Sequence, residues 1–261
     1  MDTPTASIPT TMPSNAMVYC LAMNVRQKVV IITGASAGVG LATARLLAKQ
    51  GAKVALAARS QERLQELLQE LPSSFAIPTD MSDAASVGHM VAAVHEHYGR
   101  IDALINNAGR GLYGTVEKVD VASYRAVWAL NVEGPLIAMQ KVIPLMRAQG
   151  GGSIVNISSM VSKNCFPRIG TYASTKYALN ALSLTARAEL AADCIIVSVV
   201  YPGFVETDFG KNAIKFGEET RGMESRRREH MPEPDSPEHV ASRILFALES
   251  GQAEVFMRAS A

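Results

Sequence analysis

A tyrosine and a lysine four residues apart carry the clearest signal for acid–base chemistry in this sequence. Tyr172 and Lys176 enclose the residues Ala-Ser-Thr, and side chains at this spacing share one face of an α-helix. A free tyrosine has a pKa of roughly 10, which is too high for a base at neutral pH. A neighbouring lysine cation stabilises the tyrosinate and lowers that pKa. The pair could therefore give a proton to a carbonyl oxygen or take one from an alcohol.

Ser159 lies thirteen residues before Tyr172 and could hold the same oxygen by a hydrogen bond. Taken singly, each residue has an ordinary structural explanation: Tyr172 as a half-buried helix residue, Lys176 as a solvated charge and Ser159 as a turn residue. Because the three occur together, we predict catalytic roles for all of them, with Tyr172 as the general acid and base. This proton transfer needs no metal ion, and no metal site is predicted.

A glycine-rich stretch follows the first apolar run and is typical of a turn that binds phosphate. It reads Thr-Gly-Ala-Ser-Ala-Gly-Val-Gly over residues 33–40. The first glycine allows a tight turn, the second lets the backbone approach a pyrophosphate, and the third lets the next helix pack on the strand. The helix N-terminus then offers free N–H groups and its positive dipole end to the phosphates. Dinucleotide contacts are predicted here from Gly34, Ser36, Gly38, Val39 and Gly40.

The end of the second predicted strand indicates which dinucleotide binds. A site for NAD usually has an acidic residue here, about 20 residues after the turn, which binds the ribose 2′-hydroxyl. This chain has Ala57-Ala58-Arg59-Ser60 instead. Arg59 can pair with a 2′-phosphate, and no carboxylate stands there to repel it. We therefore predict that NADP(H) is preferred over NAD(H); the alternative is that Arg59 simply faces solvent.

The elements that must position these residues alternate along the chain. Strands are predicted at residues 28–33, 54–58, 75–79, 101–106, 153–158, 195–201 and 254–257. Helices are predicted between them at residues 41–50, 60–71, 83–98, 120–146, 172–192 and 237–249. This alternation predicts an α/β fold with one doubly wound Rossmann-type domain, in which a seven-stranded parallel sheet carries helices on both faces.

Two segments fall outside the alternation. Residues 1–26 are rich in Ser, Thr and Pro and are interpreted as a flexible N-terminal leader before one domain at residues 27–261. They lack a basic start followed by an apolar core, so no secretory signal is predicted. Residues 207–235 are charged and end in a Pro-rich stretch. We expect them to cover the substrate above the carboxyl ends of the strands.

Composition excludes several classes of function. Lys and Arg total 25 and Asp and Glu total 24, so the formal net charge of +1 gives no electrostatic case for nucleic acid or an anionic membrane as partner. No run of about 18 uninterrupted apolar residues occurs, and no membrane span is expected. The three cysteines lie far apart without a Cys-x-x-Cys pair, which argues against a thiolate metal site. A reducing compartment fits this cysteine usage best, and we predict a cytoplasmic location.

Three further motifs, taken in order with the glycine-rich turn, carry a resemblance to a known family. Asn106-Asn107-Ala108-Gly109 ends the fourth predicted strand, Asn156-Ile157-Ser158-Ser159 ends the fifth, and Tyr172-Ala-Ser-Thr-Lys176 opens a helix. Each motif is modest alone, but their order and spacing are specific. From about Val25 to Met257 the chain resembles the short-chain dehydrogenase/reductase family.

The resemblance implies further site residues and their roles. Lys176 would also bind the nicotinamide ribose, and Asn131 would hold a water in a proton relay to the lysine. Contacts to adenine are implied for Asp80 and Met81, to the adenosine ribose for Asn107, Ala108 and Gly109, and to the nicotinamide amide for Pro202, Gly203, Val205 and Thr207. The predicted catalytic residues are thus Asn131, Ser159, Tyr172 and Lys176, and the last two also belong to the cofactor site. Asn107 has the alternative of merely bracing a turn.

The substrate is left open by the sequence, beyond a small carbonyl or alcohol compound. Tyr113, Phe166 and Phe209 offer apolar wall near the site, whereas Arg110 and Arg168 could anchor an acidic group. A 3-oxoacyl-carrier-protein reductase is an alternative. The chain ends, however, without the Thr-Gly segment and paired glycines of that group, which puts a homotetramer in doubt. A homodimer through the long helices after Asp120 and Tyr172 is the other possible assembly.

Two alternatives belong to other classes of protein. A non-catalytic NADP-binding sensor or scaffold would be favoured if the tyrosine or lysine were missing, and both are present. A Rossmann-type epimerase or dehydratase needs a lobe for a sugar nucleotide, and the region after Thr207 is small for one.

Overall fold

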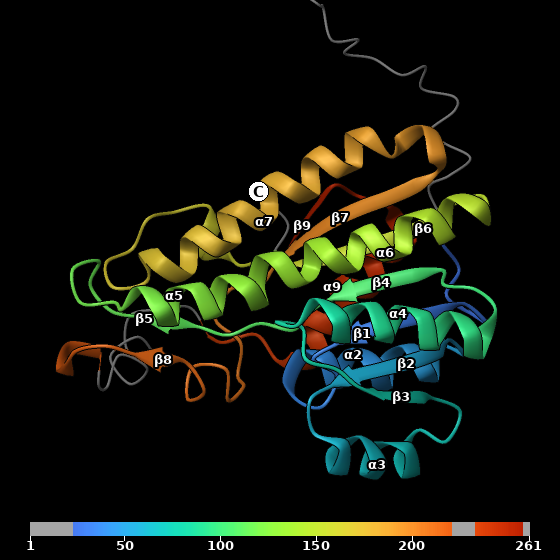
Figure 1. Cartoon of the computed structure of the whole chain (residues 1–261), viewed down its shortest axis with the longest axis horizontal. Helices are drawn as coiled ribbons and strands as arrows, with labels where there is room; N and C mark the ends of the chain where they lie inside the picture. Colours follow the sequence, from blue (N-terminus) through green and yellow to red (C-terminus); the bar gives the residue numbers. More distant parts are fainter. Residues whose placement is uncertain (1–22, 221–232, 258–261) are drawn as a thin grey trace, which may run out of the picture.

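The computed structural model describes residues 23–220 and 233–257, which form a three-layer α/β domain (Figure 1). Its central sheet has seven strands in the order β3-β2-β1-β4-β6-β7-β9, and every neighbouring pair is parallel. The strands are β1 (Val29–Thr33), β2 (Lys53–Ala58), β3 (Phe75–Pro78), β4 (Ala103–Asn106), β6 (Gly152–Ile157), β7 (Ile195–Tyr201) and β9 (Glu254–Phe256). The predicted seven-stranded parallel sheet is confirmed.

Helices cover both faces of this sheet. One face carries α2 (Gly38–Lys49), α3 (Gln61–Glu70) and α9 (Pro237–Ser250). The other carries α4 (Ala84–Tyr98), α6 (Gly134–Ala148) and α7 (Gly170–Glu189), which lie side by side in the front layer of Figure 1. Single-turn 3₁₀ helices occur at Met160–Ser162, Ala191–Asp193 and Glu218–Thr220.

Strand β1 shows why its run of apolar residues forms a central strand. Val30 and Ile32 pack into the core under α2 and α9, whereas Val29 and Ile31 pack into the core under α4 and α6. Successive side chains of a strand point to opposite faces, so a strand covered on both sides must be apolar at every position. All five residues of β1 are accordingly buried.

The strand order reverses at β1, which pairs with β2 on one side and with β4 on the other. At such a reversal the chain leaves the carboxyl ends of the two strands toward opposite faces, and sheets of this kind bind their ligands at this place. The glycine-rich turn at residues 34–40 and the segment at residues 107–109 begin at these two ends.

The helix predicted at residues 120–146 differs from the structure in its middle. The chain forms α5 (Val121–Trp128), a π-helical turn at Ala129–Glu133, and then α6. Pro135 has no N–H to donate to the carbonyl of Asn131, four residues earlier, so the regular ladder is broken there. Gly134 N–H instead bonds to the carbonyl of Ala129, five residues back. Turns of this kind are frequent at functional sites.

A second, two-stranded sheet was not predicted. β5 (Leu112–Tyr113) pairs in parallel with β8 (Ile214–Lys215), beyond one end of the main sheet (Figure 1). Each strand has two residues, which is too short for a periodic pattern to be recognised in the sequence. Strand β8 belongs to the segment predicted to cover the substrate; residues 221–232 of that segment, and residues 1–22 of the predicted leader, lie outside the described residues.

Candidate functional site

The glycine-rich turn has the conformation its residues predict. Gly34 and Gly38 have φ angles of +67° and +52°, in the left-handed region that favours glycine. Helix α2 then begins at Gly38, three residues before the predicted start, and none of the described side chains caps its N-terminus. Helices α3, α4, α5 and α9, by contrast, are capped by Ser60, Asp83, Asp120 and Ser236. The first N–H groups of α2 are therefore available to an anion.

Gly40 is required by close packing and not by its backbone angle. A Cβ atom there would lie 2.2 Å from the carbonyl oxygen of Gly34 and 2.6 Å from Nδ2 of Asn107. We expect Gly40→Ala to destabilise the fold by at least the upper end of the about 1–3 kcal/mol typical of overpacking, and to weaken dinucleotide binding. Urea unfolding measures the first effect and NADPH fluorescence titration the second.

Gly88 provides a matched control for this prediction, because it lies within α4 in more open surroundings. Its added Cβ would meet only Cε of Lys141, at 3.8 Å. Gly88→Ala should therefore stabilise the protein by about 0.5–1 kcal/mol through helix propensity. If the two variants had equal stability, the proposed packing at Gly40 would be wrong.

Asn107 braces the glycine-rich turn from the neighbouring strand. Its Nδ2 donates to the carbonyls of Thr33 and Gly34 at 2.9 and 3.3 Å. The Thr33 hydroxyl in turn accepts the N–H groups of Asn107 and Ala108, both at 3.0 Å. The bracing alternative for Asn107 is thus present in the structure, and Thr33, which the sequence analysis did not single out, joins the two carboxyl ends. The only sequence signal for it was its place at the last position of a buried strand.

Arg59 and Asp80 lie just beyond the carboxyl ends of the adjacent strands β2 and β3, and both are exposed. Asp80 Oδ1 accepts the Ser82 hydroxyl at 2.6 Å and the Ser82 N–H at 2.9 Å. These bonds, and to a smaller extent the charge of Arg59, lower the pKa of the Asp80 carboxyl. Met81 is buried, and its carbonyl oxygen would be 2.1 Å from a Cβ at Gly134. Ser60 is occupied as the cap of α3.

Tyr172 and Lys176 are brought together on the buried face of α7, as their spacing predicts. Tyr172 is 7% exposed and Lys176 is 5% exposed. Lys176 Nζ lies 6.0 Å from the centre of the Tyr172 ring and donates to the carbonyl of Ile157, at the end of β6, at 2.9 Å. Burial away from water disfavours the charged form and lowers the pKa of Lys176 to about 8.

Ser159 follows β6 by two residues and is held from α7 through a second serine. The Ser162 hydroxyl donates to the carbonyl of Ser159 at 2.6 Å and accepts a hydrogen bond from Asn180 Nδ2 at 2.9 Å. Asn180 lies one helical turn after Lys176, on the same face. The sequence analysis missed Ser162 and Asn180; the spacing of four residues from Lys176 was the available signal for Asn180.

Asn131 is fully buried in the π-helical turn. Its Oδ1 accepts the N–H of Arg110 at 2.9 Å, and its Nδ2 donates to the carbonyl of Arg110 at 3.0 Å and to the Thr175 hydroxyl at 3.1 Å. A Cβ at Gly109 would lie 3.2 Å from Asn131 Oδ1 and 3.6 Å from Lys176 Nζ. The segment after β4 therefore lies directly against both the π-helical turn and the buried lysine.

The segment after β7 lies against both the residues that follow β6 and the glycine-rich turn. The carbonyl of Pro202 accepts the N–H of Met160, next to Ser159, at 2.9 Å. A Cβ at Gly38 would lie 3.1 Å from Cγ2 of Thr207. Val205 forms a parallel bridge with Asp235, which ties the start of this segment to its far end. The predicted site residues thus converge from the ends of β1, β4, β6 and β7 and from the buried face of α7.

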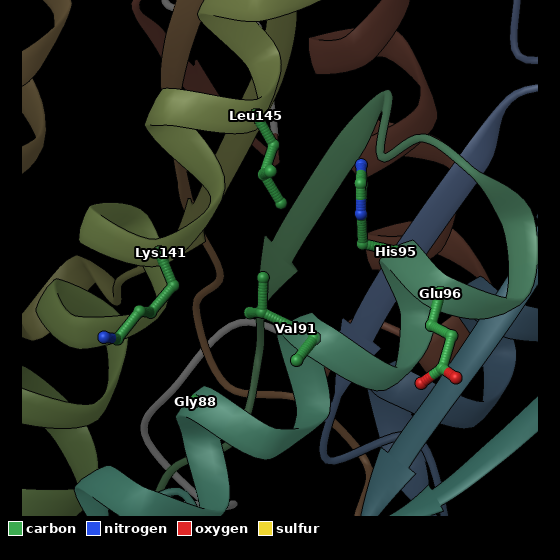
Figure 2. Close-up of a pocket in the computed structure, with 7 residues that line it drawn as sticks. Gly88, Val91, His95, Glu96, Lys141 and Leu145 are labelled. Atoms are coloured by element: carbon green, nitrogen blue, oxygen red, sulfur yellow. The ribbon is translucent and has the colours of Figure 1, made fainter.

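A groove of about 490 Å³ lies elsewhere, between α4 and α6 (Figure 2). Val91, His95 and Glu96 line it from α4, and Lys141 and Leu145 line it from α6. It contains none of the predicted site residues. Within residues 23–220 and 233–257, no group of three or more His, Cys, Asp or Glu side chains is arranged to hold a metal ion. No helix in these ranges has the length and apolar character to cross a lipid bilayer.

Comparison with known proteins places this chain in a family. The family model for short chain dehydrogenases matches residues 28–216. The dehydrogenase/reductase SDR family member 7B of Danio rerio is 35% identical over an alignment of 201 positions, which covers 73% of this chain and 65% of the relative. An uncharacterized oxidoreductase of Methylorubrum extorquens is 38% identical over an alignment of 186 positions, which covers 69% of this chain and 74% of the relative.

Two crystal structures extend the similarity to the whole fold. A short-chain dehydrogenase from Streptomyces avermitilis has a TM-score of 0.81 and 34% identity, and the match covers 91% of this chain and 90% of the other. The L-sorbose reductase of Gluconobacter frateurii, complexed with NADPH and L-sorbose, has a TM-score of 0.79 and 29% identity, covering 90% of this chain and 97% of its own. The chain belongs to the short-chain dehydrogenase/reductase family and is an oxidoreductase of that family.

Proposed function

We propose that this protein is an NADP(H)-dependent oxidoreductase that transfers hydride between the nicotinamide and a carbonyl or secondary alcohol. The observation that carries the proposal is the buried pair on α7, in which Lys176 Nζ lies 6.0 Å from the ring of Tyr172. With its pKa lowered to about 8 by burial, Lys176 is still mostly cationic at neutral pH. Its charge favours the tyrosinate, which makes Tyr172 both a better proton donor and a usable base.

The residues present fit a dinucleotide. The positive φ angles of Gly34 and Gly38 and the uncapped start of α2 present backbone N–H groups suited to a pyrophosphate. Preference for NADP(H) rests on Arg59, which lies at the end of β2 and whose charge already acts on Asp80. A guanidinium at this place can pair with a 2′-phosphate. The similar L-sorbose reductase was crystallised with NADPH.

Each catalytic candidate takes a defined part in reduction. A reduced nicotinamide held beside these residues would supply the hydride for the carbonyl carbon. Tyr172 gives its phenolic proton to the carbonyl oxygen as that oxygen gains the electron pair of the C=O π bond, and the product is an alcohol. Ser159 holds the same oxygen by a hydrogen bond, Lys176 stabilises the tyrosinate that remains, and Asn131 shapes the backbone beside the lysine. Oxidation of an alcohol is the reverse.

Titration of the purified protein with NADPH and NADH, followed by a panel of ketones and aldehydes, tests this function. The expected result is tighter binding of NADPH and turnover of at least one carbonyl compound. Tight binding without turnover across a broad panel would instead favour the sensor or scaffold alternative. Absence of binding to either dinucleotide would overturn the proposal.

The lowered pKa of Lys176 predicts the pH dependence of the reaction. Below pH 8 the lysine is a cation and supports proton transfer from Tyr172; above pH 8 it becomes neutral and that support is lost. The value of kcat/KM for carbonyl reduction should therefore be level at neutral pH and fall through about pH 8, because kcat/KM reports the pKa values of the free enzyme.

The variant Lys176→Arg distinguishes the lysine from other causes of this fall. Arginine stays cationic throughout this pH range. The kcat/KM that the variant retains should therefore show no decrease near pH 8. If the variant and the wild type fell at the same pH, the assignment of that pKa to Lys176 would be wrong.

A 3-oxoacyl-carrier-protein reductase remains the second candidate within this function, and a cytoplasmic location remains a prediction. Assembly as a homodimer is supported by α7, where Tyr177 and Leu184 are exposed by 42% and 37%. They are seven residues apart and so share the outer face of that helix.

A further inference from the structure

Two aromatic rings cover the ring of Tyr172. The ring of Tyr113 meets it edge-on, with centres 6.4 Å apart and an interplanar angle of 86°. The ring of Phe209 lies tilted against it, with centres 5.8 Å apart and an angle of 56°. Tyr113 comes from β5 and Phe209 from the segment after β7, five residues before β8, the strand that pairs with β5.

Tyr113 is fixed by the fold. It lies in the small sheet with β8, its carbonyl accepts the N–H of Phe216 at 2.8 Å, and it is buried in an apolar cluster. Its hydroxyl would be 3.0 Å from a Cβ at Gly111, so the ring is folded closely over the backbone. The other buried members of this cluster are Leu112, Val127, Ile169 and Tyr172. Tyr113 therefore forms a rigid wall beside Tyr172.

Phe209 is held differently, because it lies at the surface with 36% of its area exposed. Phe166 and Val116 are also exposed, by 44% and 81%, and they lie on the two other segments next to Tyr172, at residues 160–169 and 112–119. Covering an exposed apolar side chain with another apolar group removes both surfaces from water, which is favourable. Phe209 is the one that already contacts the ring of Tyr172, so a group packed on Phe209 lies beside the proposed proton donor.

Charged side chains near Phe209 have hydrogen-bonding partners within the protein. Asp208 and Lys211 form an ion pair with a distance of 2.6 Å and are both about 70% exposed. The Nε of Arg110 donates to the carbonyl of Asn212 at 2.9 Å. Besides these groups, the apolar side chains of Val127 and Ile169 pack in the same cluster as Tyr172 and Tyr113. These surroundings fit an apolar group better than an acid or a polyol.

We propose that Phe209 is a specificity-determining residue that packs against the apolar body of the substrate while the Tyr172 hydroxyl donates to the carbonyl oxygen of the substrate. This inference rests on the proposed function and narrows it. The substrate class is a ketone, or the matching secondary alcohol, that carries an aromatic or branched aliphatic group next to the reacting carbon. Ketoses, with a hydroxyl on each neighbouring carbon, are disfavoured because those hydroxyls would lose water beside Tyr113 and Phe209.

The test compares three carbonyl probes with wild-type protein, Phe209→Ala and Phe209→Leu under saturating NADPH. Acetophenone provides an aromatic body, acetone has none, and fructose is a ketose with several hydroxyl groups. The wild type should have its highest kcat/KM with acetophenone. Phe209→Ala should lower that value roughly 10- to 100-fold, mainly through KM, and should change acetone little. Phe209→Leu should recover part of the loss, and the Kd for NADPH should stay the same in all three proteins.

Phe166→Ala is the matched control, since it removes an exposed phenylalanine from a neighbouring loop without removing a ring that contacts Tyr172. It should reduce acetophenone turnover far less than Phe209→Ala does. A wild-type preference for fructose, or an equal loss for all three probes in Phe209→Ala, would overturn the inference while leaving the proposed function intact. Absence of turnover with every carbonyl would contradict the proposed function itself.

Discussion

Replacing Tyr172 with phenylalanine should lower kcat for carbonyl reduction by roughly 10²- to 10⁴-fold, the usual contribution of a positioned general acid. The substitution removes only the hydroxyl, so the ring contacts with Tyr113 and Phe209 are kept and the fold should be unchanged. The Kd for NADPH should stay close to the wild-type value, because the glycine-rich turn and Arg59 are untouched. Steady-state kinetics and fluorescence titration of the same preparation measure both quantities.

Tyr177→Phe is the control for this variant. Tyr177 lies on the same helix, five residues further on, but its side chain is 42% exposed on the outer face. Removing the Tyr177 hydroxyl should leave kcat unchanged. If Tyr172→Phe turned over at the wild-type rate, Tyr172 would not be the acid. If it also lost NADPH binding, the residue would have a structural role in the cofactor site.

Arg59→Asp should weaken NADPH binding roughly 10- to 100-fold, because a charge-assisted hydrogen bond contributes about 1.5–3 kcal/mol and about 1.4 kcal/mol corresponds to a factor of ten. The new carboxylate would also repel the 2′-phosphate. NADH has a 2′-hydroxyl instead, which an acid at the end of β2 can bind. The affinity for NADH should therefore be kept or improved, and the ratio of the two Kd values should reverse or approach one.

Arg63→Asp is the charge-matched control. Arg63 lies four residues later, on α3, and its guanidinium pairs with Glu66 at 2.5 Å. This variant changes the net charge by the same amount, so any effect on NADPH measures the long-range electrostatic part alone, which salt screens. Equal losses for NADPH and NADH in Arg59→Asp would show that Arg59 does not recognise the 2′-phosphate.

The sequence by itself determined the type of fold and the place of its chemical groups along the chain. Apolar runs of four to seven residues that alternate with amphipathic stretches can be buried only as strands between two helical layers, and the seven strands form where these runs occur. The four-residue spacing of Tyr172 and Lys176 required one helix face, because the geometry of the α-helix is local. The requirement for glycine at positions 34 and 38 is likewise local, because it comes from the positive φ angles of the turn itself.

Contacts between distant segments could not be predicted in the same way. Strands β5 and β8 have two residues each and are separated by about a hundred residues, so neither has a pattern of its own. The bonds from Asn107 to the glycine-rich turn and from Asn180 to Ser162 depend on which strands and helices become neighbours. Pro135 was visible in the sequence, but the π-helical turn at Asn131 also depends on the packing of Gly134 against the Met81 carbonyl.

The tertiary structure alone decided the electrostatics and access of the site. Lys176 has an ordinary lysine pKa in an unfolded chain, and only its burial beside the Ile157 carbonyl lowers the value to about 8. Phe209 lies 37 residues from Tyr172 in the sequence, yet its ring contacts that of the tyrosine. Desolvation and contact depend on all the groups that surround a side chain in space, whereas residue type and spacing record only its neighbours along the chain.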